Sequence, residues 1–500
     1  MHQTLIDLQE DYDELETLTQ SVKSKISQFK KHLKEHPEFY RPTVHDYLQS
    51  KAESLEDMCS QLIIQIPSKQ AIRSFTTEDI QENIDKKREY KHILRIIHSE
   101  TGCLLTSGDW QSPTFENTGI SLAGKETGKI QGQETDYKRD WHADGSSFEA
   151  QFRKEYIDSG MHLVPGVFTT SSGMSAFTTI LEHLKLRSKI KGPILVGQSI
   201  YFENRWLVEQ AFPGQVTVFN EFDTEEALEI MKQIKPKIVF VDSLSNSGDI
   251  RVPDLKTLLR KGSKILPFRT VFVIDNSALA TSFHPLKHLS ILNHIRLFVI
   301  ESLNKYYQFG MDRVTGGVVW CSPLEAFLFH KTRVHLGTIL SDTSVCTLPS
   351  PNRKLLDKRL ARFQRNATYI AETLDKYLNT HPNSIFSHIV YPGLPNHPSY
   401  LWTQSNSFHG SFFVLGFHPL HQKVSTYQRV VKQVIQTAKK YNVDMVSGTS
   451  FGMDTTRIYL TARYADRDTT PFVRISVGTE TLDEVEKIIQ VFIKVFSTHS

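Results

Sequence analysis

Cysteine and long apolar runs are scarce in this 500-residue chain. Its four cysteines are widely scattered, with no Cys-x-x-Cys pair and no His-Cys spacing of the kind that binds zinc. No segment approaches the roughly 18 consecutive apolar residues of a membrane-spanning helix, and the first residues lack the basic start and apolar stretch of an export signal. We therefore expect a cytoplasmic protein without a metal site or a membrane segment.

A large excess of one charge is also missing, since 58 Lys and Arg stand against 55 Asp and Glu, for a formal net charge of +3. There is no long basic stretch with interleaved aromatic residues, so the composition does not favour nucleic acid as a partner. With 39% hydrophobic residues, the chain can bury a large core and form two or three domains.

The first hundred residues have a helical pattern. Apolar residues recur at alternating spacings of three and four from Leu5 to Leu33, interrupted only by Thr19, which is typical of a long amphipathic helix. Two further apolar stripes follow, and Gly102 is expected to end the last of them. We predict an α-helical module over residues 1–105, which packs on its own chain, joins subunits or binds another protein.

Beyond residue 160, strand-like apolar runs alternate with amphipathic helical stretches. The runs lie at 194–196, 216–219, 238–241, 271–274 and 297–300. Such alternation predicts an α/β fold with a mainly parallel sheet. We place a linker and N-terminal arm at 106–160, a large domain at 161–335 and a smaller C-terminal α/β domain at 336–500.

Two side chains follow strand-like runs, where the predicted sheet would place a ligand. Asp275 comes directly after the run 271–274, and Lys305 lies just past the run 297–300. Ligands of open α/β sheets bind at the carboxyl ends of the strands. Pyridoxal phosphate needs a lysine that forms a Schiff base and an acid that binds the pyridinium nitrogen, so these two residues predict an enzyme with this cofactor. The alternative is a loop lysine and a helix-capping aspartate.

Four further sequence features could belong to the same site as Asp275 and Lys305. The segment 171–174 precedes an apolar helical stretch, and the N–H groups of a helix start bind phosphate. Tyr201 can stack on a flat cofactor or act as an acid, Asn246 can bond a ring oxygen, and Arg474, inside an apolar run, suits a carboxylate. Each feature also has a purely structural alternative. The segment 171–174 can cap a helix, Tyr201 can pack in the core, Asn246 can form a turn, and Arg474 can make a buried ion pair.

Short motifs in this chain occur in the order found in a known family. They are Tyr137-Lys138-Arg139, Ser171-Ser172-Gly173-Met174, Tyr201, Ser245-Asn246, Ile274-Asp275-Asn276, Ser302 with Lys305-Tyr306, Gly316-Gly317-Val318-Val319, Ser450-Phe451-Gly452 and Val473 to Gly478. From about residue 137 to its end, the chain resembles the cystathionine γ-synthase/γ-lyase family, the pyridoxal-phosphate enzymes of cysteine and methionine metabolism, which have the fold-type-I architecture. The helical module has no counterpart in the usual plan of that family.

The resemblance implies roles for particular residues. Those implied in catalysis are Lys305 and Tyr201. Those implied in binding an amino-acid substrate are Arg474, Ser450 and Asn246. Those implied in cofactor binding are Ser172, Gly173, Met174, Tyr201, Asn246, Asp275, Ser302 and Lys305. In addition, Tyr137 and Arg139 would reach the cofactor phosphate of a neighbouring subunit, which implies a homodimer or homotetramer.

Three departures from the family pattern concern the substrate entrance and the cofactor surroundings. Phe202-Glu203-Asn204 stands where Gly-Gly-Thr is usual, Ala143-Asp144-Gly145 lies near the expected Asn-Pro-Thr, and Asn304 replaces a hydroxyl residue, which removes a phosphate contact. Three hypotheses therefore stay open. The first is a transsulfuration-type enzyme that acts on a sulfur or O-activated amino acid by γ-replacement or by β- or γ-elimination. The second is a different pyridoxal-phosphate γ-substitution in specialised biosynthesis, and the third is a non-catalytic scaffold or regulatory protein with a vestigial core.

Overall fold

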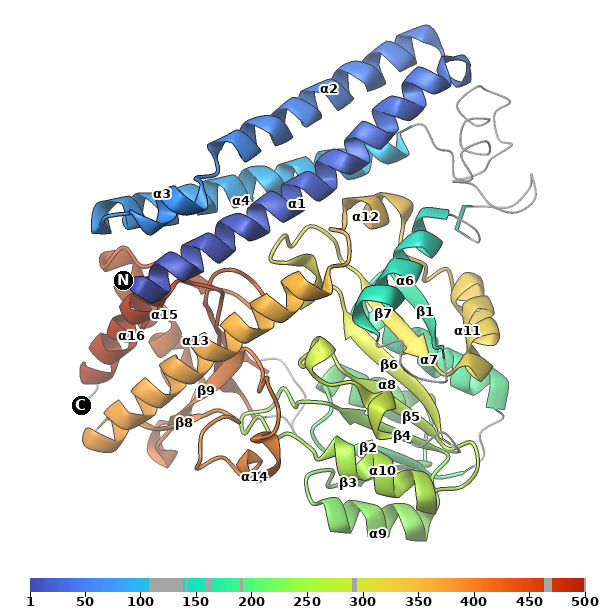
Figure 1. The fold of residues 1–500 in the computed structure, drawn as a ribbon. Helices are drawn as coiled ribbons and strands as arrows, with labels where there is room; N and C mark the ends of the chain where they lie inside the picture. Colours follow the sequence, from blue (N-terminus) through green and yellow to red (C-terminus); the bar gives the residue numbers. More distant parts are fainter. Residues whose placement is uncertain are drawn as a thin grey trace.

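The structure is a computed structural model of the chain. It describes residues 1–107, 138–139, 143–157, 164–188, 192–289, 295–382, 384–462 and 470–498. Three parts can be followed along the chain in Figure 1: a group of helices, a large sheet with its covering helices, and a second, smaller sheet with helices of its own.

A seven-stranded sheet forms the centre of the molecule, in the order β1-β7-β6-β5-β4-β2-β3. Its strands are β1 (Gly166–Thr170), β2 (Ile194–Gly197), β3 (Val216–Phe219), β4 (Ile238–Asp242), β5 (Val271–Asp275), β6 (Arg296–Ser302) and β7 (Gly317–Cys321). Strands β3, β2, β4, β5 and β6 run parallel, whereas β7 is antiparallel to both β6 and β1. The predicted α/β fold with a mainly parallel sheet is confirmed.

Helices cover both faces of this sheet because neighbouring residues of a buried strand point to opposite sides. Ile194 and Val196 of β2 join an apolar cluster with residues of α7, α8 and α11, while Leu195 between them joins a second cluster with residues of α6, α9 and α10. These helices are α6 (Ala143–Tyr156), α7 (Gly173–Ser188), α8 (Phe202–Ala211), α9 (Thr224–Ile234), α10 (Leu255–Ile265) and α11 (Pro323–Leu336). Residues far apart in the chain thus share one core on each face.

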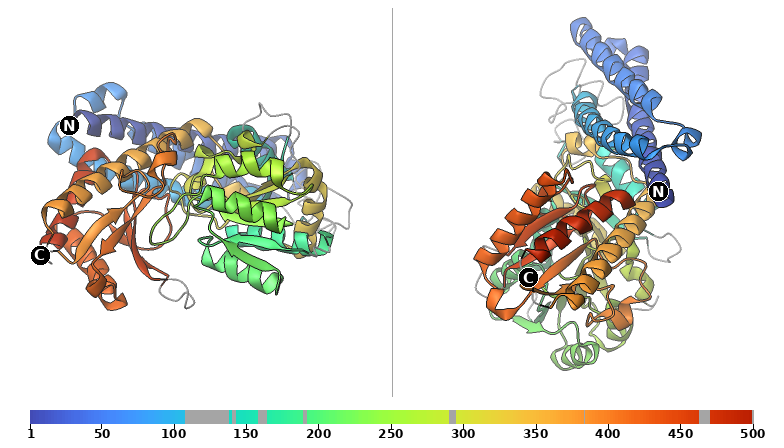
Figure 2. Two further views of the ribbon diagram at one scale, coloured as in Figure 1. Left: turned by 90° about the horizontal axis from the view of Figure 1, so that it is seen from below. Right: turned by 90° about the vertical axis from the view of Figure 1, so that its left-hand side faces the viewer.

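A five-stranded sheet follows, in the order β10-β11-β12-β9-β8. Its strands are β8 (Phe386–Val390), β9 (Phe412–Phe417), β10 (Val446–Ser447), β11 (Arg457–Thr461) and β12 (Phe472–Ser476). Its helices are α13 (Arg353–Thr380), α14 (Tyr400–Thr403), α15 (Val424–Lys440) and α16 (Leu482–Ser497). Helices α13, α15 and α16 share an apolar cluster with the sheet and lie side by side over it (Figure 2).

The N-terminal helical module consists of α1 (His2–Glu35), α2 (Pro42–Gln65), α3 (Lys69–Arg73) and α4 (Thr77–Thr106). The stripe of α1 is buried, and the Thr19 hydroxyl donates to the Leu15 carbonyl at 2.7 Å, which explains why a polar residue is tolerated there. Gly102 does not end its helix as predicted. It lies where α4 meets α12 (Asp342–Thr347), and a Cβ on Gly102 would meet Thr347 Oγ1 at 1.9 Å. The module therefore packs on its own chain (Figure 1).

Helix α6 lies inside the segment predicted as linker and arm. Its Phe148, Phe152 and Tyr156 follow one another at spacings of four and are all buried, which is the pattern of an amphipathic helix. Short 3-10 helices occur at Pro37–Phe39, Ala280–Ser282, Pro285–His288, Tyr306–Gln308 and Pro419–His421.

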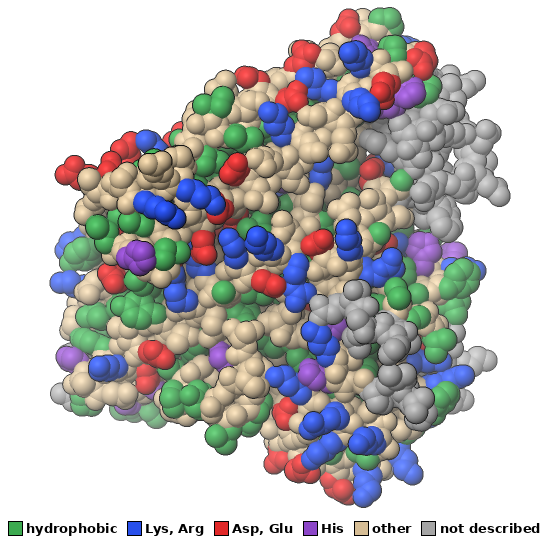
Figure 3. Space-filling view, in the orientation of Figure 1, with side chains coloured by type: hydrophobic (Ala, Val, Ile, Leu, Met, Phe, Trp, Pro, Cys, Tyr) green, Lys and Arg blue, Asp and Glu red, His purple; other side chains and the backbone are tan. Residues whose placement is uncertain are grey.

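The structure also shows how charge is distributed on one face and whether the cysteines are paired. Acidic and basic side chains are interspersed on the face that Figure 3 shows. Within the described ranges, no helix has the length and apolar character needed to cross a bilayer, and no group of three or more His, Cys, Asp or Glu side chains is placed to hold a metal ion. All four cysteines are free thiols.

Candidate active site

A cavity of about 300 Å³ lies at the carboxyl edge of the central sheet, beside the ends of β4, β5 and β6 and the start of α7. The predicted site residues that line it are Ser172, Gly173, Met174, Tyr201, Asn246, Asp275, Ser302, Lys305, Ser450 and Arg474. The cavity is also lined by Asn204, Asp242, Leu244, Ser277, Ala278, Asn304, Thr315, Phe412, Thr449 and Phe451. Of the remaining predicted residues, Arg139 lies exposed in a turn, and Tyr137 falls outside the described residues.

Lys305 lies between β6 and the 3-10 helix Tyr306–Gln308. Its Nζ donates to Ser450 Oγ at 2.7 Å and lies 4.8 Å from the centre of the Phe451 ring. Burial, reinforced by the positive charge of Arg474, lowers the pKa of the Lys305 amine to about 8. An appreciable fraction of this amine is therefore neutral near pH 7, as a nucleophile or base requires.

Two buried carboxyl groups stand at adjacent strand ends. Asp275 of β5 and Asp242 of β4 are register partners in the sheet. Burial raises the pKa of Asp275 even though this carboxyl accepts a hydrogen bond from Ser277 N at 2.9 Å. Burial and the nearby Asp275 also raise the pKa of Asp242, whose Oδ2 accepts from Tyr201 N at 2.9 Å. The positive charge of Lys305 offsets part of this effect at Asp275, and a protonated ring nitrogen would add a second cation beside the two carboxyl groups.

The start of α7 is held in close contact with the strands beside it. Ser172 Oγ accepts from Ser175 N at 2.9 Å and so caps the helix. A Cβ on Gly317 would lie 2.4 Å from Ser172 O, and a Cβ on Gly173 would lie 3.3 Å from Ser302 Cβ. Glycine at these two positions lets the backbones approach and keeps open a helix start of the kind that binds phosphate.

Tyr201 also lines the cavity, at the start of α8. Burial raises its pKa above the usual range, and the neighbouring Glu203 adds to the shift, so the phenol keeps its proton at neutral pH. The Asn204 side chain hydrogen-bonds to Asp275. The sequence marks residues 202–204 only as a departure from a pattern, whereas the structure places one of them beside the predicted cofactor acid.

Arg474 of β12 is a buried cation that makes no ion pair with an acid among the residues that the structure describes. Its Nη1 donates to Asn246 Oδ1 at 2.6 Å, and its Nη2 donates to Ser450 O at 3.3 Å. The guanidinium carbon lies 5.3 Å and 5.8 Å from the ring centres of Phe412 and Phe451. Burial lowers the pKa of Arg474 to about 10, and none of the described carboxylates forms an ion pair with it. The alternative of a buried structural ion pair therefore finds no support in the described residues.

Several lining residues could not be identified from the sequence. Phe412 begins an ordinary apolar strand, and nothing in that run marks it as a cavity wall. Asp242 directly follows the run 238–241, but no motif in the sequence marks it as a second acid of this cavity. Asn304, for which the sequence predicts the loss of a phosphate contact, has a structural role, because its Oδ1 accepts from Gly316 N at 2.9 Å next to Lys305.

Comparison with known proteins identifies the family. The model of the Cys/Met metabolism PLP-dependent enzymes matches residues 110–491. The chain belongs to this family. It is also similar to the bifunctional enzyme flvA of Aspergillus flavus, with 25% identity over 331 residues, which is 66% of this chain. The matched stretch spans only 39% of the length of that relative.

Solved structures of family enzymes share the fold. Cystathionine gamma synthase from Xanthomonas oryzae pv. oryzae is 18% identical with a TM-score of 0.57, and the match covers 74% of this chain and 90% of that one. Cystathionine gamma-lyase from Lactobacillus plantarum is also 18% identical with a TM-score of 0.57, covering 74% and 91%. The fold-type-I architecture is therefore confirmed, and α1 to α4 lie outside the family match.

The family depends on pyridoxal phosphate, and the residues of the cavity fit this cofactor. The Lys305 amine has a lowered pKa, the buried acids Asp275 and Asp242 have raised pKa values, and glycines open the helix start at α7. These are the nucleophile, the partner for a ring cation and the anion cradle that such a cofactor needs.

Proposed function

We propose that this chain is a transsulfuration-type enzyme, acting on a sulfur or O-activated amino acid by γ-replacement or by β- or γ-elimination. The observation that carries the proposal is Arg474, a buried guanidinium in the same cavity as Lys305. Both hydrogen bonds of Arg474 go to uncharged acceptors, an amide oxygen and a carbonyl oxygen. Its guanidinium can therefore bind the α-carboxylate of an amino acid in a charge-assisted pair.

Particular residues would hold the cofactor. Lys305 would bind it covalently, Asp275 would pair with its ring nitrogen, and Tyr201 would stack on the ring. The phosphate would be bound by Ser172, Gly173, Met174 and Ser302. When bound, pyridoxal phosphate withdraws electrons from the substrate and so acidifies its Cα–H bond.

The protein groups would then position the substrate and move protons. Arg474 holds the carboxylate, and its bonds to Asn246 and Ser450 fix its direction beforehand. Lys305, with a pKa of about 8, takes the Cα proton, because a base whose pKa is near the working pH is effective. The protonated Tyr201 gives a proton to the leaving group. A leaving group on Cγ leads to γ-elimination or γ-replacement, and one on Cβ leads to β-elimination.

A different γ-substitution in specialised biosynthesis is the second candidate. Phe412 and Phe451 give the cavity an apolar wall, and Asn204 stands where a small polar segment is usual. An apolar wall favours a reaction partner with an apolar part over a simple thiol.

An amino-acid panel separates these functions. Protein loaded with pyridoxal phosphate is given β- and γ-substituted amino acids, and keto-acid and thiol release are measured. We expect turnover of a sulfur or O-acyl substrate, its loss in Lys305→Ala, and a roughly 10- to 100-fold higher KM in Arg474→Gln, the effect of losing a charge-assisted hydrogen bond. Arg474→Lys is the matched control and should recover part of the affinity.

Negative results in this panel also distinguish between the proposed functions. No turnover of any sulfur substrate would contradict the transsulfuration proposal, and replacement at Cγ by a nucleophile other than a thiol would select the second candidate. Protein that neither binds the cofactor nor turns over any substrate would select the scaffold hypothesis.

We also propose that the active form is a homodimer or homotetramer. Arg139 is exposed and does not line the cavity of its own chain. The phosphate contact that the family resemblance implies for it therefore requires the cavity of a neighbouring subunit.

A further inference from the structure

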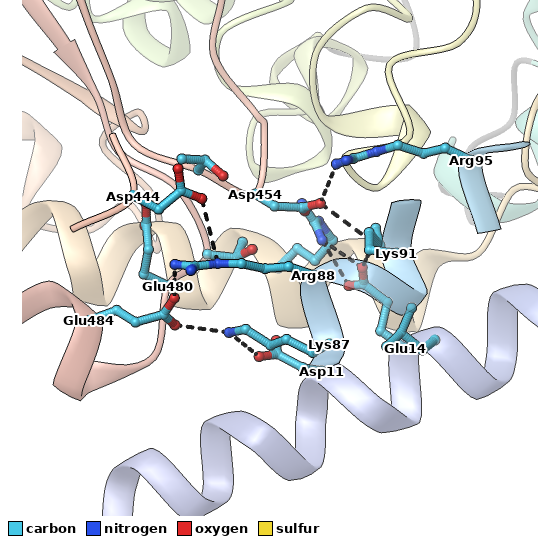
Figure 4. A pocket seen from close by; sticks show the side chains of 14 residues that line it. Asp11, Glu14, Lys87, Arg88, Lys91, Arg95, Asp444, Asp454, Glu480 and Glu484 are labelled. Carbon is cyan, nitrogen blue, oxygen red and sulfur yellow. Dashed lines mark hydrogen bonds and ion pairs between the residues drawn. The ribbon is translucent and has the colours of Figure 1, made fainter. Parts of the chain in front are cut away.

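A guanidinium from the N-terminal helical module reaches the segments around the candidate lysine. Arg95 of α4 donates to Gly310 O from Nε at 3.2 Å and from Nη2 at 2.9 Å, and its Nη2 also donates to Asp454 Oδ2 at 3.0 Å. Figure 4 shows Arg95 extending from α4 toward Asp454. Gly310 lies five residues after Lys305 and Asp454 four residues after Ser450, so one side chain joins both segments.

The two segments, 306–312 and 449–454, are in tight contact. A Cβ on Gly310 would lie 2.1 Å from Asp454 Oδ1. A Cβ on Gly452 would lie 2.7 Å from the Lys305 carbonyl carbon. Ser450 Oγ accepts the hydrogen bond of Lys305 Nζ at 2.7 Å. A small shift of either segment would therefore move the amine or its hydrogen-bond partner.

Both segments contain strained backbone. Phe309, Asp312 and Ser450 have φ values of 50°, 51° and 74°, although none is glycine. The left-handed region is unfavourable for a residue with a Cβ, so such a conformation persists only where its surroundings hold it. External contacts are therefore needed to keep this geometry.

Asp454, which accepts a hydrogen bond from Arg95, belongs to a buried network of charged side chains. Asp454 Oδ1 accepts from Arg359 Nη2 at 2.7 Å, and Glu14 of α1 pairs with both Arg359 and Lys91. Burial alone would raise the pKa of Asp454, but Lys91, Arg359 and Arg95 lower it below its usual range. Asp454 is thus an anion that α4 and α13 hold in place together (Figure 4).

We propose that Arg95 is a positioning residue, through which the N-terminal helical module fixes the segments 306–312 and 449–454 and so sets the place and basicity of the Lys305 amine. The proposal rests on the proposed role of Lys305 and adds a function for helices that lie outside the family match. The module is then part of the catalytic apparatus.

The test compares Arg95→Met with Arg88→Met in the full-length protein. Arg88 lies on the same helix and also joins the module to the rest of the chain, by donating to Glu484 Oε1 at 2.6 Å, but it contacts neither segment. Hydrogen exchange is measured on peptides covering 306–312 and 449–454. The pH midpoint for Schiff-base formation between cofactor-free protein and pyridoxal phosphate is measured in parallel.

In Arg95→Met we expect exchange about tenfold faster in both segments, as for the loss of one charge-assisted hydrogen bond, and a displaced pH midpoint. Arg88→Met should match the wild type in both readouts. Arg95→Lys keeps the charge but cannot bridge two acceptors as a guanidinium does, so hydrogen exchange in both segments should be intermediate. If Arg95→Met does not fold, Arg95→Lys is the variant to test.

Wild-type exchange and an unchanged midpoint in the Arg95 variants would overturn the proposal, as would equal effects of Arg88→Met and Arg95→Met. Neither readout needs a substrate. A wild type that forms the Schiff base but turns over no amino acid would contradict the proposed reaction alone, and a wild type that forms no Schiff base would overturn both.

Discussion

Lys305 and Arg474 place two basic groups in one cavity, where the positive charge of Arg474 lowers the pKa of Lys305. Burial is the main reason that the Lys305 pKa falls to about 8, and the fixed charge of Arg474 is the next. Asp275 opposes both effects by favouring the charged amine. The cavity thus keeps Lys305 reactive near neutral pH without removing its counterion.

Removing the Arg474 charge should raise the Lys305 pKa. In wild-type protein freed of cofactor, the rate of Schiff-base formation with pyridoxal phosphate should rise with pH around a midpoint of about 8, because only the neutral amine attacks. In Arg474→Gln the midpoint should move upward, toward the ordinary lysine value. Arg474→Lys keeps a cation and should stay near the wild type. An unchanged midpoint in Arg474→Gln would show that Arg474 does not act on this amine.

The elements that build the site are the ends of β4, β5 and β6 and the start of α7. Glycine at Gly317 allows β7 to touch the start of α7, since a Cβ there would lie 2.4 Å from Ser172 O and 2.7 Å from Ser172 C. Backbone atoms cannot yield as a flexible side chain can. The proposed phosphate cradle would therefore depend on this position.

Gly317→Ala should weaken cofactor binding by about tenfold or more, as expected when overpacking costs roughly 1–3 kcal/mol. Titration of cofactor-free protein with pyridoxal phosphate measures the affinity. Gly262→Ala in α10 is a suitable control, because a Cβ there meets its nearest atom at an ordinary 3.5 Å. Wild-type affinity in Gly317→Ala would mean that this contact does not shape the phosphate site.

The parallel strands could be predicted because a strand buried on both faces is a continuous apolar run, as in β4 and β5. Strands β1 and β7 were not predicted, since each begins with glycine and β1 ends in two threonines. Ser450 lies 145 residues from Lys305 along the chain, and a family motif was the signal that brought it into the predicted site. The contact of Arg95 with Gly310 spans 215 residues and has no motif, so it needed the structure.

At the scale of the whole molecule, we propose that the helical module and a partner subunit complete the site from outside the large sheet. The module docks through buried apolar stripes and through charge pairs such as Lys87 with Glu484, 2.9 Å apart. The partner would supply Arg139. Both contributions come from segments outside the large domain.

Subunit complementation tests the second contribution. Arg139→Ala should bind the cofactor weakly, and Lys305→Ala should be inactive. Mixed dimers of the two variants contain one intact site each, so an equal mixture should recover about a quarter of the wild-type sites. Arg139→Lys serves as the charge-retaining control. An active enzyme that is strictly monomeric, or a mixture with no recovery, would contradict the shared site.

The most direct test of the account is to identify the lysine that carries the cofactor. The full-length protein is incubated with pyridoxal phosphate, reduced with borohydride to make the Schiff base permanent, digested and examined by peptide mass spectrometry. We expect a reduced cofactor on Lys305, and no labelled peptide from this region in Lys305→Ala. Stoichiometric labelling of another lysine, or no labelling of the wild type, would contradict it.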